Sequence, residues 1–500
     1  MANVIGRIID QGGHVFNAED PNFGIVGDGT TNDSAAINNA ITAVVAAGGG
    51  TLVFGARVYG LASPVEIATD KVRLEGRGFA STTFKALAAM PQVIRTRAQG
   101  AEVDGIKIDA NVLANHGLDV QHSPFGRFRV QTVNALFDGI HLSSTQVNGA
   151  ATINDAITFD GCQSIGNGRV FATSGIQGHW TGTARNPRKV TVSGTVNVTA
   201  GSSQVTGVGT NFTAIPTRRG DVIVIGNPAS ATTTWRAYQI QSVNSATGLT
   251  LLPGRLPDAS GSALQYAVCV GDGYREDLHN DNNINRILGG LYRNNAGSGV
   301  VLAGLYGTNL YGTQIDYNGA YGTMLNFASA DGTTIAAALD RVYFEGNGVA
   351  PAFFGSAYQF SMREPNWDAG PLGQFYHIGN PIYTAGILTT AEVGNVRRMV
   401  MDQIGSATIR IPCERVALSG AVDTGGGVGN GYIYSVPFTG VDATRARIVA
   451  QAQGGGQNGA SPGAVEWWIS NRTTGGFTLN VKNVSGTIQS MSGEWVAFYP

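Results

Sequence analysis

Residues 27–59 read GDGTTNDSAAINNAITAVVAAGGGTLVFGARVY, and this stretch decides the fold. Asp33 or Ser34 can accept hydrogen bonds from the first free N–H groups of a helix. The apolar residues that recur at helical spacing are Ile37, Ile41, Val44 and Val45. The glycines at 48–50 can end this helix, and residues 51–54 predict a strand. Because most of the following sequence predicts strands, we expect the helix to cover the open end of a stacked β structure.

Much of the chain after residue 72 repeats a unit of strand, turn and strand at intervals of about 22 to 29 residues, which is typical of stacked repeats. In the first block the predicted strands are 103–109, 128–134 and 156–160, with glycine-led restarts at 117–118, 139–140 and 168–170. In the second block the segments 291–295, 315–319 and 342–346 superpose with offsets of 24 and 27 residues. The repeats predict an all-β protein built on a right-handed parallel β-helix of roughly ten coils, with Asn side chains aligned at the bends.

Two segments depart from this rhythm. Residues 189–270 contain hairpin-like strands with tight turns and predict a small antiparallel β domain inserted into one coil. Residues 401–500 alternate apolar and polar residues around glycine-rich turns, which favours a C-terminal β-sandwich for trimerisation or carbohydrate binding. The predicted domains are an N-terminal segment with the cap at 1–60, a first part of the β-helix at 61–188, the insertion at 189–270, a second part at 271–400 and the sandwich at 401–500.

Composition limits the partners. The net charge of -2 provides no excess positive potential, so nucleic acid is not expected as a partner. Cys162, Cys269 and Cys413 are odd in number and far apart, so the sequence predicts neither a disulfide framework nor a metal centre, and no cofactor. The start MANVIGRIIDQGG lacks the features of a secretion signal, and no apolar run approaches membrane-spanning length. We therefore expect a cytoplasmic product that does not insert into membranes and leaves the cell by another route if it acts outside.

Residues 15–67 resemble the opening of the pectate-lyase-like β-helix superfamily, which typically reads FGAxGDGxTDDxxAI, a helix, then GGGxVxFPAGxY. The matching residues are Asp28, Gly29, Thr31, Asp33, Ala36 and Ile37. Gly55 stands where the family usually has Pro, and Arg57 where it has Gly. The resemblance specifies the fold far more than the chemistry, because hydrolases, lyases, epimerases and non-catalytic spikes share this scaffold.

The inserted segment is similar to small β modules of bacteriophage tail proteins, and the whole chain resembles a phage tailspike or capsule depolymerase. The resemblance implies a homotrimer that binds bacterial surface polysaccharide and other phage tail or baseplate proteins. It also implies a location in the virion, with secretion from a bacterium as the alternative.

A first candidate site lies in the second repeat block. There Ile315 and Tyr317 are expected to face the core, and Gln314, Asp316 and Asn318 to face outward. Glycosidic hydrolysis needs one protonated and one ionised carboxyl group, and Asp316 and Glu345 are the candidate pair. We expect about 8 Å between their Cβ atoms, which suits an inverting enzyme. The alternative is that both are ordinary solvated or turn-forming residues.

Three neighbours of this pair are candidates for substrate binding: Arg341, Tyr343 and Tyr292. A second cluster, residues 273–282, follows the insertion. Its candidate catalytic residues are Glu276, Asp277 and Asp281, and its candidate binding residues are Tyr274, Arg275 and His279. Asp277 and Asp281 could also bind calcium, although they lack a diagnostic spacing for it. A solvated junction between domains would explain the same composition.

Elimination stays open beside hydrolysis. A lyase needs a cation to neutralise a uronate and a side chain to take the C5 proton. Arg341 with Tyr343, or Arg275 with His279, could provide these groups. The remaining histidines considered, His14, His116, His122 and His141, are scattered and show no pairing.

Three functions are therefore expected as alternatives. The first is a trimeric tailspike that degrades bacterial surface polysaccharide by hydrolysis with paired carboxylates. The second is a non-catalytic receptor-binding spike. The third is a polysaccharide lyase or epimerase outside any virion.

Overall fold

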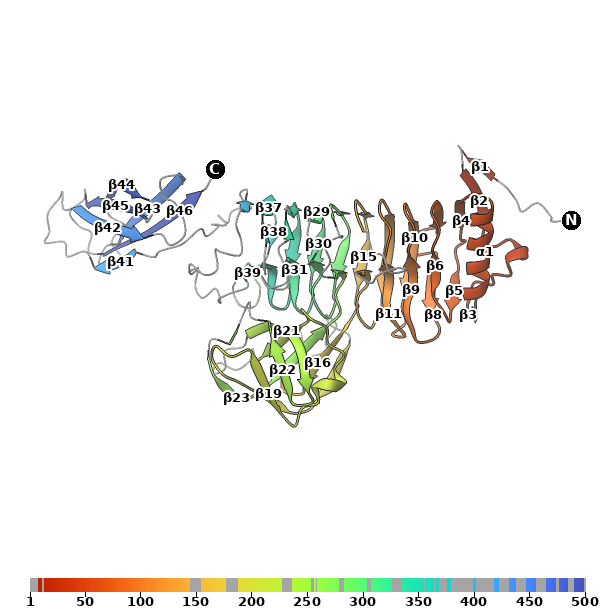
Figure 1. The fold of residues 1–500 in the computed structure, drawn as a ribbon, viewed down its shortest axis with the longest axis horizontal. Helices are drawn as coiled ribbons and strands as arrows, with labels where there is room; N and C mark the ends of the chain where they lie inside the picture. Colours follow the sequence, from red (N-terminus) through yellow and green to blue (C-terminus); the bar gives the residue numbers. More distant parts are fainter. Residues whose placement is uncertain are drawn as a thin grey trace. The chain divides into compact units, whose positions relative to one another are not determined.

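Parallel strands stack into a β-solenoid of about 11 turns in the computed structural model, which confirms the predicted parallel β-helix (Figure 1). The chain divides into two compact units, residues 1–382 with 395–408, and residues 383–394 with 409–500. The structure describes residues 8–10, 13–143, 154–176, 188–226, 236–252, 256–257, 259–277, 283–303, 307–325, 334–335, 337–354, 357–358, 360–363, 366–367, 376–378, 399–401, 418–421, 431–437, 447–455, 465–473, 476–483 and 490–498.

Three faces of parallel strands build the solenoid. The first face is β2 (Gly13–Asn17), β4 (Gly50–Val53), β7 (Val72–Glu75), the first halves of β10 (Glu102–Asp109) and β12 (Arg127–Val133), β14 (Thr158–Asp160), β26 (Arg286–Leu288), β29 (Asn309–Tyr311), β33 (Ala338–Asp340), β37 (Phe360–Arg363) and β40 (Met399–Met401). The second face is β3 (Asp28–Asn32), β5 (Val58–Leu61), β8 (Thr83–Ala86), the second halves of β10 and β12, β15 (Gln163–Ile165), β27 (Leu291–Arg293), β30 (Gln314–Asp316), β34 (Tyr343–Glu345) and β38 (Asn366–Trp367). The third face is β6 (Val65–Ile67), β9 (Met90–Thr96), β11 (Ala114–Val120), β13 (Ile140–Leu142), β25 (Tyr274–Glu276), β28 (Val300–Leu302), β31 (Tyr321–Leu325), β35 (Ala350–Phe354) and β39 (Tyr376–Ile378).

The predicted helix is α1 (Ser34–Ala46), and its buried apolar side chains contact the first coils at β4, β6 and β7. The short helix η1 (Pro21–Phe23) and the hairpin of β1 (Ile8–Asp10) with β2 lie near it in sequence. The start of α1 differs from the prediction that Asp33 caps the helix with its side chain. The Asp33 side chain accepts hydrogen bonds from the backbone N–H groups of Val26 and Gly27, at 2.8 and 3.1 Å, and none from the helix. Asp33 therefore holds the preceding loop.

A buried ladder of asparagines sets the register of the coils. Asn167, Asn295, Asn318 and Asn347 are fully or almost fully buried, and each side chain bonds the backbone or amide of the next. Successive ladder residues after the insertion lie 23 and 29 residues apart, so the predicted offsets of 24 and 27 are wrong. The predicted alignment matched the starts of the strands. The register of the coils is instead fixed by the buried asparagine side chains, whose amide groups need hydrogen-bond partners inside the core.

Asn295→Ala is expected to lower the free energy of unfolding by several kcal/mol. The Asn295 side chain accepts from the backbone and side chain of Asn167 and donates to Ser164 O at 3.0 Å and to Asn318 Oδ1 at 2.9 Å. Each buried group left without a partner costs about 1–3 kcal/mol. Thermal unfolding of the variant measures this, with the exposed Asn211→Ala as control. Equal melting temperatures for the two variants would contradict the role of the ladder.

The inserted domain begins earlier than residue 189. Its sheet comprises β16 (Arg169–Thr173), β17 (Lys189–Val192), β18 (Thr195–Val198), β19 (Gln204–Val208), β20 (Val222–Ile225), β21 (Arg236–Ser245), β22 (Gly248–Leu251), β23 (Gly261–Leu264) and β24 (Tyr266–Val270), with η2 (Phe212–Ala214). The restart predicted at 168–170 therefore leads into the insertion, and β25 takes its place beside β13. Gly168 and Gly271, with φ of +82° and +96°, stand where the chain leaves and rejoins the coil. A Cβ on Gly271 would lie 2.6 Å from Gly168 Cα, so a side chain does not fit there.

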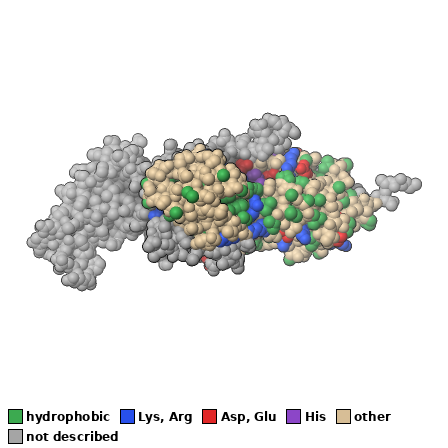
Figure 2. Space-filling view, turned by 90° about the horizontal axis from the view of Figure 1, so that it is seen from below, with side chains coloured by type: hydrophobic (Ala, Val, Ile, Leu, Met, Phe, Trp, Pro, Cys, Tyr) green, Lys and Arg blue, Asp and Glu red, His purple; other side chains and the backbone are tan. Residues whose placement is uncertain are grey.

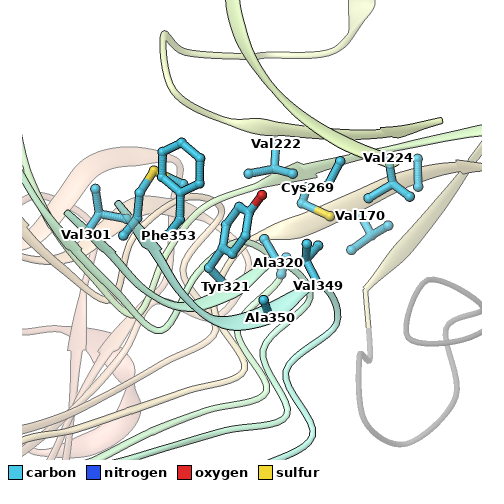
Figure 3. Close-up of a cluster of buried hydrophobic side chains, with 14 of the residues drawn as sticks. Val170, Val222, Val224, Cys269, Val301, Ala320, Tyr321, Val349, Ala350 and Phe353 are labelled. Atoms are coloured by element: carbon cyan, nitrogen blue, oxygen red, sulfur yellow. The ribbon is translucent and has the colours of Figure 1, made fainter. Parts of the chain in front are cut away.

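The inserted domain packs on the outer side of the third face. Figure 3 shows Val170, Val222, Val224 and Cys269 of the domain against residues of the solenoid coils. The solenoid residues in this buried cluster include Val301, Ala320, Tyr321, Met324, Val349, Ala350 and Phe353. A second apolar core lies within the domain itself. The two cores make the insertion a folded body fixed to the solenoid.

The second unit contains two antiparallel sheets. One comprises β41 (Leu418–Ala421), β43 (Arg447–Gly455) and β46 (Ser490–Phe498), and the other β42 (Gly431–Pro437), β44 (Val465–Thr473) and β45 (Gly476–Asn483). Their packing into a sandwich stays a prediction. The pair β32 (Thr334–Ile335) and β36 (Ala357–Tyr358) forms a small separate sheet. Where the structure describes the chain, it contains no helix with the length and apolarity needed to span a membrane.

Candidate functional site

A polar row crosses the outer side of the third face. Arg95, Asp119, His141 and Arg275 are register partners on β9, β11, β13 and β25. Their neighbours Leu118 and Ile140 are core residues, as is Tyr274. Because side chains alternate along a strand, the polar row points away from the core. In Figure 2 histidine surface lies next to acidic and basic surface beside the inserted domain.

His141 is held between two carboxylates. Its Nδ1 lies 3.0 Å from Asp119 Oδ1, and its Nε2 lies 3.1 Å from Asp277 Oδ1. Burial opposes a charge on this ring, but the carboxylates of Asp277 and Asp119 outweigh it and raise the pKa of His141 to about 10. His141 is therefore an imidazolium at neutral pH. Burial raises the pKa of Asp119, but the hydrogen bond from His141 outweighs this and keeps it below the ordinary value.

His116 stacks on His141, with ring centroids 4.2 Å apart and planes at 9°. Its Nδ1 lies 3.3 Å from Asp138 Oδ2. Burial and the charge of His141 lower the pKa of His116, against the opposite effect of Asp138. Two stacked rings thus differ in protonation at neutral pH, one charged and one neutral.

The inserted domain completes the site with Arg218. Its guanidinium donates to both oxygens of Asp138, at 2.5 and 2.9 Å, and lies over the Phe137 ring at 5.1 Å. Asp138 is fully buried, and although burial raises its pKa, Arg218 and His116 hold that pKa well below the ordinary value. Burial raises the pKa of Asp272 to about 6, despite the opposing charge of Arg275.

A second arginine, Arg275, joins the solenoid to the inserted domain. Arg275 Nη1 donates to Asp272 Oδ2 at 2.8 Å and to Asp221 Oδ1 at 3.2 Å, and Nη2 donates to Arg219 O at 2.5 Å. Arg275 was a candidate for sugar binding, but its side chain is buried in this network. Arg275 instead links β25 of the solenoid to the residues before β20 of the inserted domain.

The third-face site, as we call His116, Asp119, Asp138, His141 and Asp277, contains matched acid and base groups. A neutral imidazole can accept a proton, and an adjacent imidazolium can stabilise developing negative charge. Environments that push the pKa values of two neighbouring groups apart are typical of acid–base sites. The arrangement is therefore suited to proton abstraction from a carbon next to a carboxylate.

A metal role is not supported by the donor set. Within the described residues, His116, Asp138 and His141 offer ligand atoms within 4.8 Å of one another. Both nitrogens of His141 already face carboxylates, and both oxygens of Asp138 accept from Arg218. A cation bound there would displace these contacts.

The stability of the site is expected to depend on pH through His141. The pKa of His141 is about 10 in the folded protein and about 6.5 when unfolded, so its contribution is full below about pH 6.5 and is lost as pH rises towards 10. The melting temperature of wild type should exceed that of His141→Gln at pH 6, and the gap should narrow towards pH 10. Melting curves across this range measure the gap. A gap independent of pH would contradict the charge assigned to His141.

The first candidate pair has a different geometry from the prediction. Asp316 and Glu345 are direct register partners on β30 and β34, so their Cβ atoms lie about 5 Å apart and not 8 Å. Asp316 is fully buried beneath Arg293, whose Nε donates to Oδ1 at 2.9 Å and whose Nη2 donates to Oδ2. Glu345 accepts hydrogen bonds from the hydroxyls of Tyr317 and Tyr343.

The predicted facing of two residues is reversed. Tyr317 was expected in the core, and Asn318 outside. Tyr317 has a φ of +54°, and this left-handed residue ends the simple alternation of the strand. Its hydroxyl therefore meets Glu345, and Asn318 joins the buried ladder. Arg341 is 73% exposed and lies 4.0 Å from Asp340.

Three other candidates lie inside the solenoid. Tyr292, Tyr274 and Glu276 are fully buried, so none presents a side chain to a substrate. Glu276 accepts from the hydroxyls of Tyr274, at 3.0 Å, and Thr308. They occupy core positions because β25 and β27 place every second residue inward. Asp277 belongs to the third-face site, and His279 and Asp281 lie outside the described residues.

Sequence reasoning missed the histidine pair, although a signal was present. The restarts at 117–118 and 139–140 were aligned correctly, since Leu118 pairs with Ile140. The same alignment places Asp119 opposite His141. The conclusion that the histidines show no pairing was wrong for His116 and His141.

No family model matches the chain. Among curated proteins, it is similar to the mannuronan C5-epimerases AlgE3 and AlgE1 of Azotobacter vinelandii, with 38% identity over 95 residues and 40% over 86 residues. These stretches cover 18% and 16% of this chain but 5% and 6% of the relatives. The chain thus spans a small part of the length of the curated relatives it matches.

Among solved structures, ORF18 of Geobacillus virus E2 has a TM-score of 0.42 and 13% identity, covering 97% of this chain and 76% of that one. The Dettilon tailspike protein has a TM-score of 0.36 and 11% identity, covering 97% and 94%. The A-module of the epimerase AlgE4 from Azotobacter vinelandii has a TM-score of 0.29 and 17% identity, covering 78% and 98%. At these TM-scores the likenesses carry no weight for function.

Proposed function

We propose that the protein is a phage tailspike with enzymatic activity. It degrades a uronate-containing polysaccharide of the bacterial surface, and the reaction is an elimination at the third-face site. The observation that carries the proposal is the stacked pair of His116 and His141, enclosed by carboxylates on the outer side of the solenoid. A polyuronate substrate is favoured by the local similarity to proteins named mannuronan C5-epimerases. The homotrimer, the tail or baseplate partners and the virion location are part of this proposal, as the resemblance to tailspikes implies.

The chemistry divides between the two rings. His116 accepts the C5 proton of a uronate residue, and the electron pair of the broken C–H bond moves toward the carboxylate. Both N–H groups of His141 are taken by Asp119 and Asp277, so its imidazolium acts on the negative charge that develops there through its electrostatic field alone. The C4–O bond then breaks, a C4–C5 double bond forms, and the leaving oxygen takes the proton back from His116. The products are one new chain end and one unsaturated uronate.

Incubation with host capsule, exopolysaccharide or O-antigen tests this function. We expect falling polymer length together with the ultraviolet absorbance of an unsaturated uronate. Shorter polymer with new reducing ends and no such absorbance would show hydrolysis. Unchanged length with altered uronate stereochemistry would show epimerisation, and binding without chemical change would show a receptor-binding spike. Each of these three results would contradict elimination.

Hydrolysis at Asp316 and Glu345 is the second candidate function, favoured by their direct pairing on adjacent coils. A spacing of about 5 Å between the Cβ atoms is closer to the carboxyl separation of a retaining hydrolase than to that of the inverting one predicted from the sequence. Against it, Arg293 and two tyrosines already occupy these carboxylates.

The Glu345→Gln variant tests which of the two sites, the third-face site or the pair Asp316 and Glu345, carries the reaction. If the third face carries the chemistry, turnover should stay within about twofold of wild type, whereas loss of a general acid or base lowers it by about 10²–10⁴-fold. Turnover is measured on the polymer that the wild type degrades. A loss of the larger size, with the fold intact, would transfer the active site to the second face.

A further inference from the structure

One row of outward-facing residues runs along the third face and is most exposed at the end away from the inserted domain. Glu66, Arg95, Asp119, His141 and Arg275 are successive register partners. The exposed fraction of the side chain is 39% at Glu66 and 17% at Arg95, but only 5% at Asp119, 11% at His141 and 4% at Arg275. A polymer that followed this row would therefore meet its most exposed surface at β6 and β9 and covered surface beyond His141.

The same row continues under the inserted domain. Val301, Met324 and Phe353 are the next register partners, and their side chains are at most 1% exposed. All three belong to one buried cluster with valines of the domain, and Figure 3 shows Val301 and Phe353 in it. Above them, Gln239 Nε2 of the domain donates to the Tyr321 hydroxyl at 3.5 Å. No substrate can lie on this part of the row while the domain is in place.

The edge of the domain beside His141 is fixed by charged contacts. Arg218 binds Asp138, and Arg275 of the solenoid binds Asp221 and the carbonyl of Arg219. Asp138, Asp221 and Arg275 are buried, so parting these contacts would leave their charges without partners. The domain edge therefore acts as a fixed barrier next to the histidine pair.

We propose that the inserted domain blocks one end of the substrate's path along the third face, so that the enzyme captures the end of a polysaccharide chain and releases short products from it. This inference rests on the proposed function of the third-face site. The more exposed end of the row, at β6 and β9, holds the body of the polymer. The barrier made by the residues before β20 stops its terminus beside His116 and His141. The distance from His116 to this barrier sets the length of the released product.

The dependence of rate on polymer length tests this inference. Below saturation the initial rate is proportional to the molar concentration of productive sites, so a polymer about ten times longer should be cleaved about tenfold more slowly at equal mass if only ends are used. Product analysis should show one short oligosaccharide from the first time point, with little early loss of viscosity. Rates independent of length, with a broad range of intermediate products and an early collapse of viscosity, would overturn the inference and leave the proposed function intact.

A binding measurement provides a readout without turnover. The His116→Gln variant is titrated with size fractions of the polymer that the wild type degrades. The number of protein molecules bound per polymer chain should stay constant as the chain lengthens. A number that grows in proportion to length would show internal binding and contradict end capture. If the wild type degrades no polymer at all, the proposed function fails, and this inference fails with it.

Discussion

Replacing His116 with glutamine is expected to lower turnover by about 10²–10⁴-fold, the usual contribution of a general base. Glutamine keeps the size and a hydrogen-bonding group next to Asp138 but cannot take up a proton. The neighbouring His141 cannot replace it, because both of its nitrogens face carboxylates and its pKa is about 10. Formation of unsaturated product at saturating polymer measures the loss.

His14→Gln, in β2 far from the site along the chain, is the matched control and should keep wild-type turnover. The melting temperature of His116→Gln should also stay near that of the wild type, since the variant removes no buried charge. A His116→Gln protein with turnover within about twofold of wild type would contradict the role of this ring as the base.

Replacing Arg218 with alanine is expected to cost about 3–5 kcal/mol of stability, because it leaves the fully buried Asp138 without its cation. It should also impair activity, since Asp138 lies beside His116 and would then favour protonation of that ring. Arg218→Lys should recover only part of the loss, as an ammonium group lacks the paired geometry that meets both oxygens of Asp138.

Thermal unfolding and the pH dependence of turnover separate the two effects. The exposed Arg127→Ala on β12 is the control and should change stability by no more than about 0.5 kcal/mol. In Arg218→Ala the pH at which His116 loses its proton should rise, so the acid limb of the activity profile should move upward. An unchanged profile with unchanged stability would show that the inserted domain does not support the site.

The fold could be predicted because its signals are local. The helix and the glycines of residues 27–59 follow one another in the chain, and the repeats recur at short intervals. The predicted facing of Asn318 was wrong because one left-handed residue, Tyr317, reverses which side chains point into the core. The predicted start of the insertion was too late, because the sequence of β16 (Arg169–Thr173) resembles another solenoid strand. Only its pairing with β24 assigns it to the inserted domain.

The site was harder to predict because its members are distant in sequence. Asp119 and His141 are 22 residues apart, and His141 and Asp277 are 136 apart with the inserted domain between them. Arg218 reaches Asp138 from 80 residues away, which no repeat pattern encodes. Residue types alone instead pointed to Glu276 and Tyr292, whose side chains the alternation of their strands buries.

An experimental structure of the His116→Gln variant with an oligosaccharide of the degraded polymer tests the central claim most directly. The predicted result is a uronate residue beside His141 on the third face, with the chain extending over β11 and β9 and ending at Arg218. An oligosaccharide bound over Asp316 and Glu345 on the second face, with the third face empty, would contradict it.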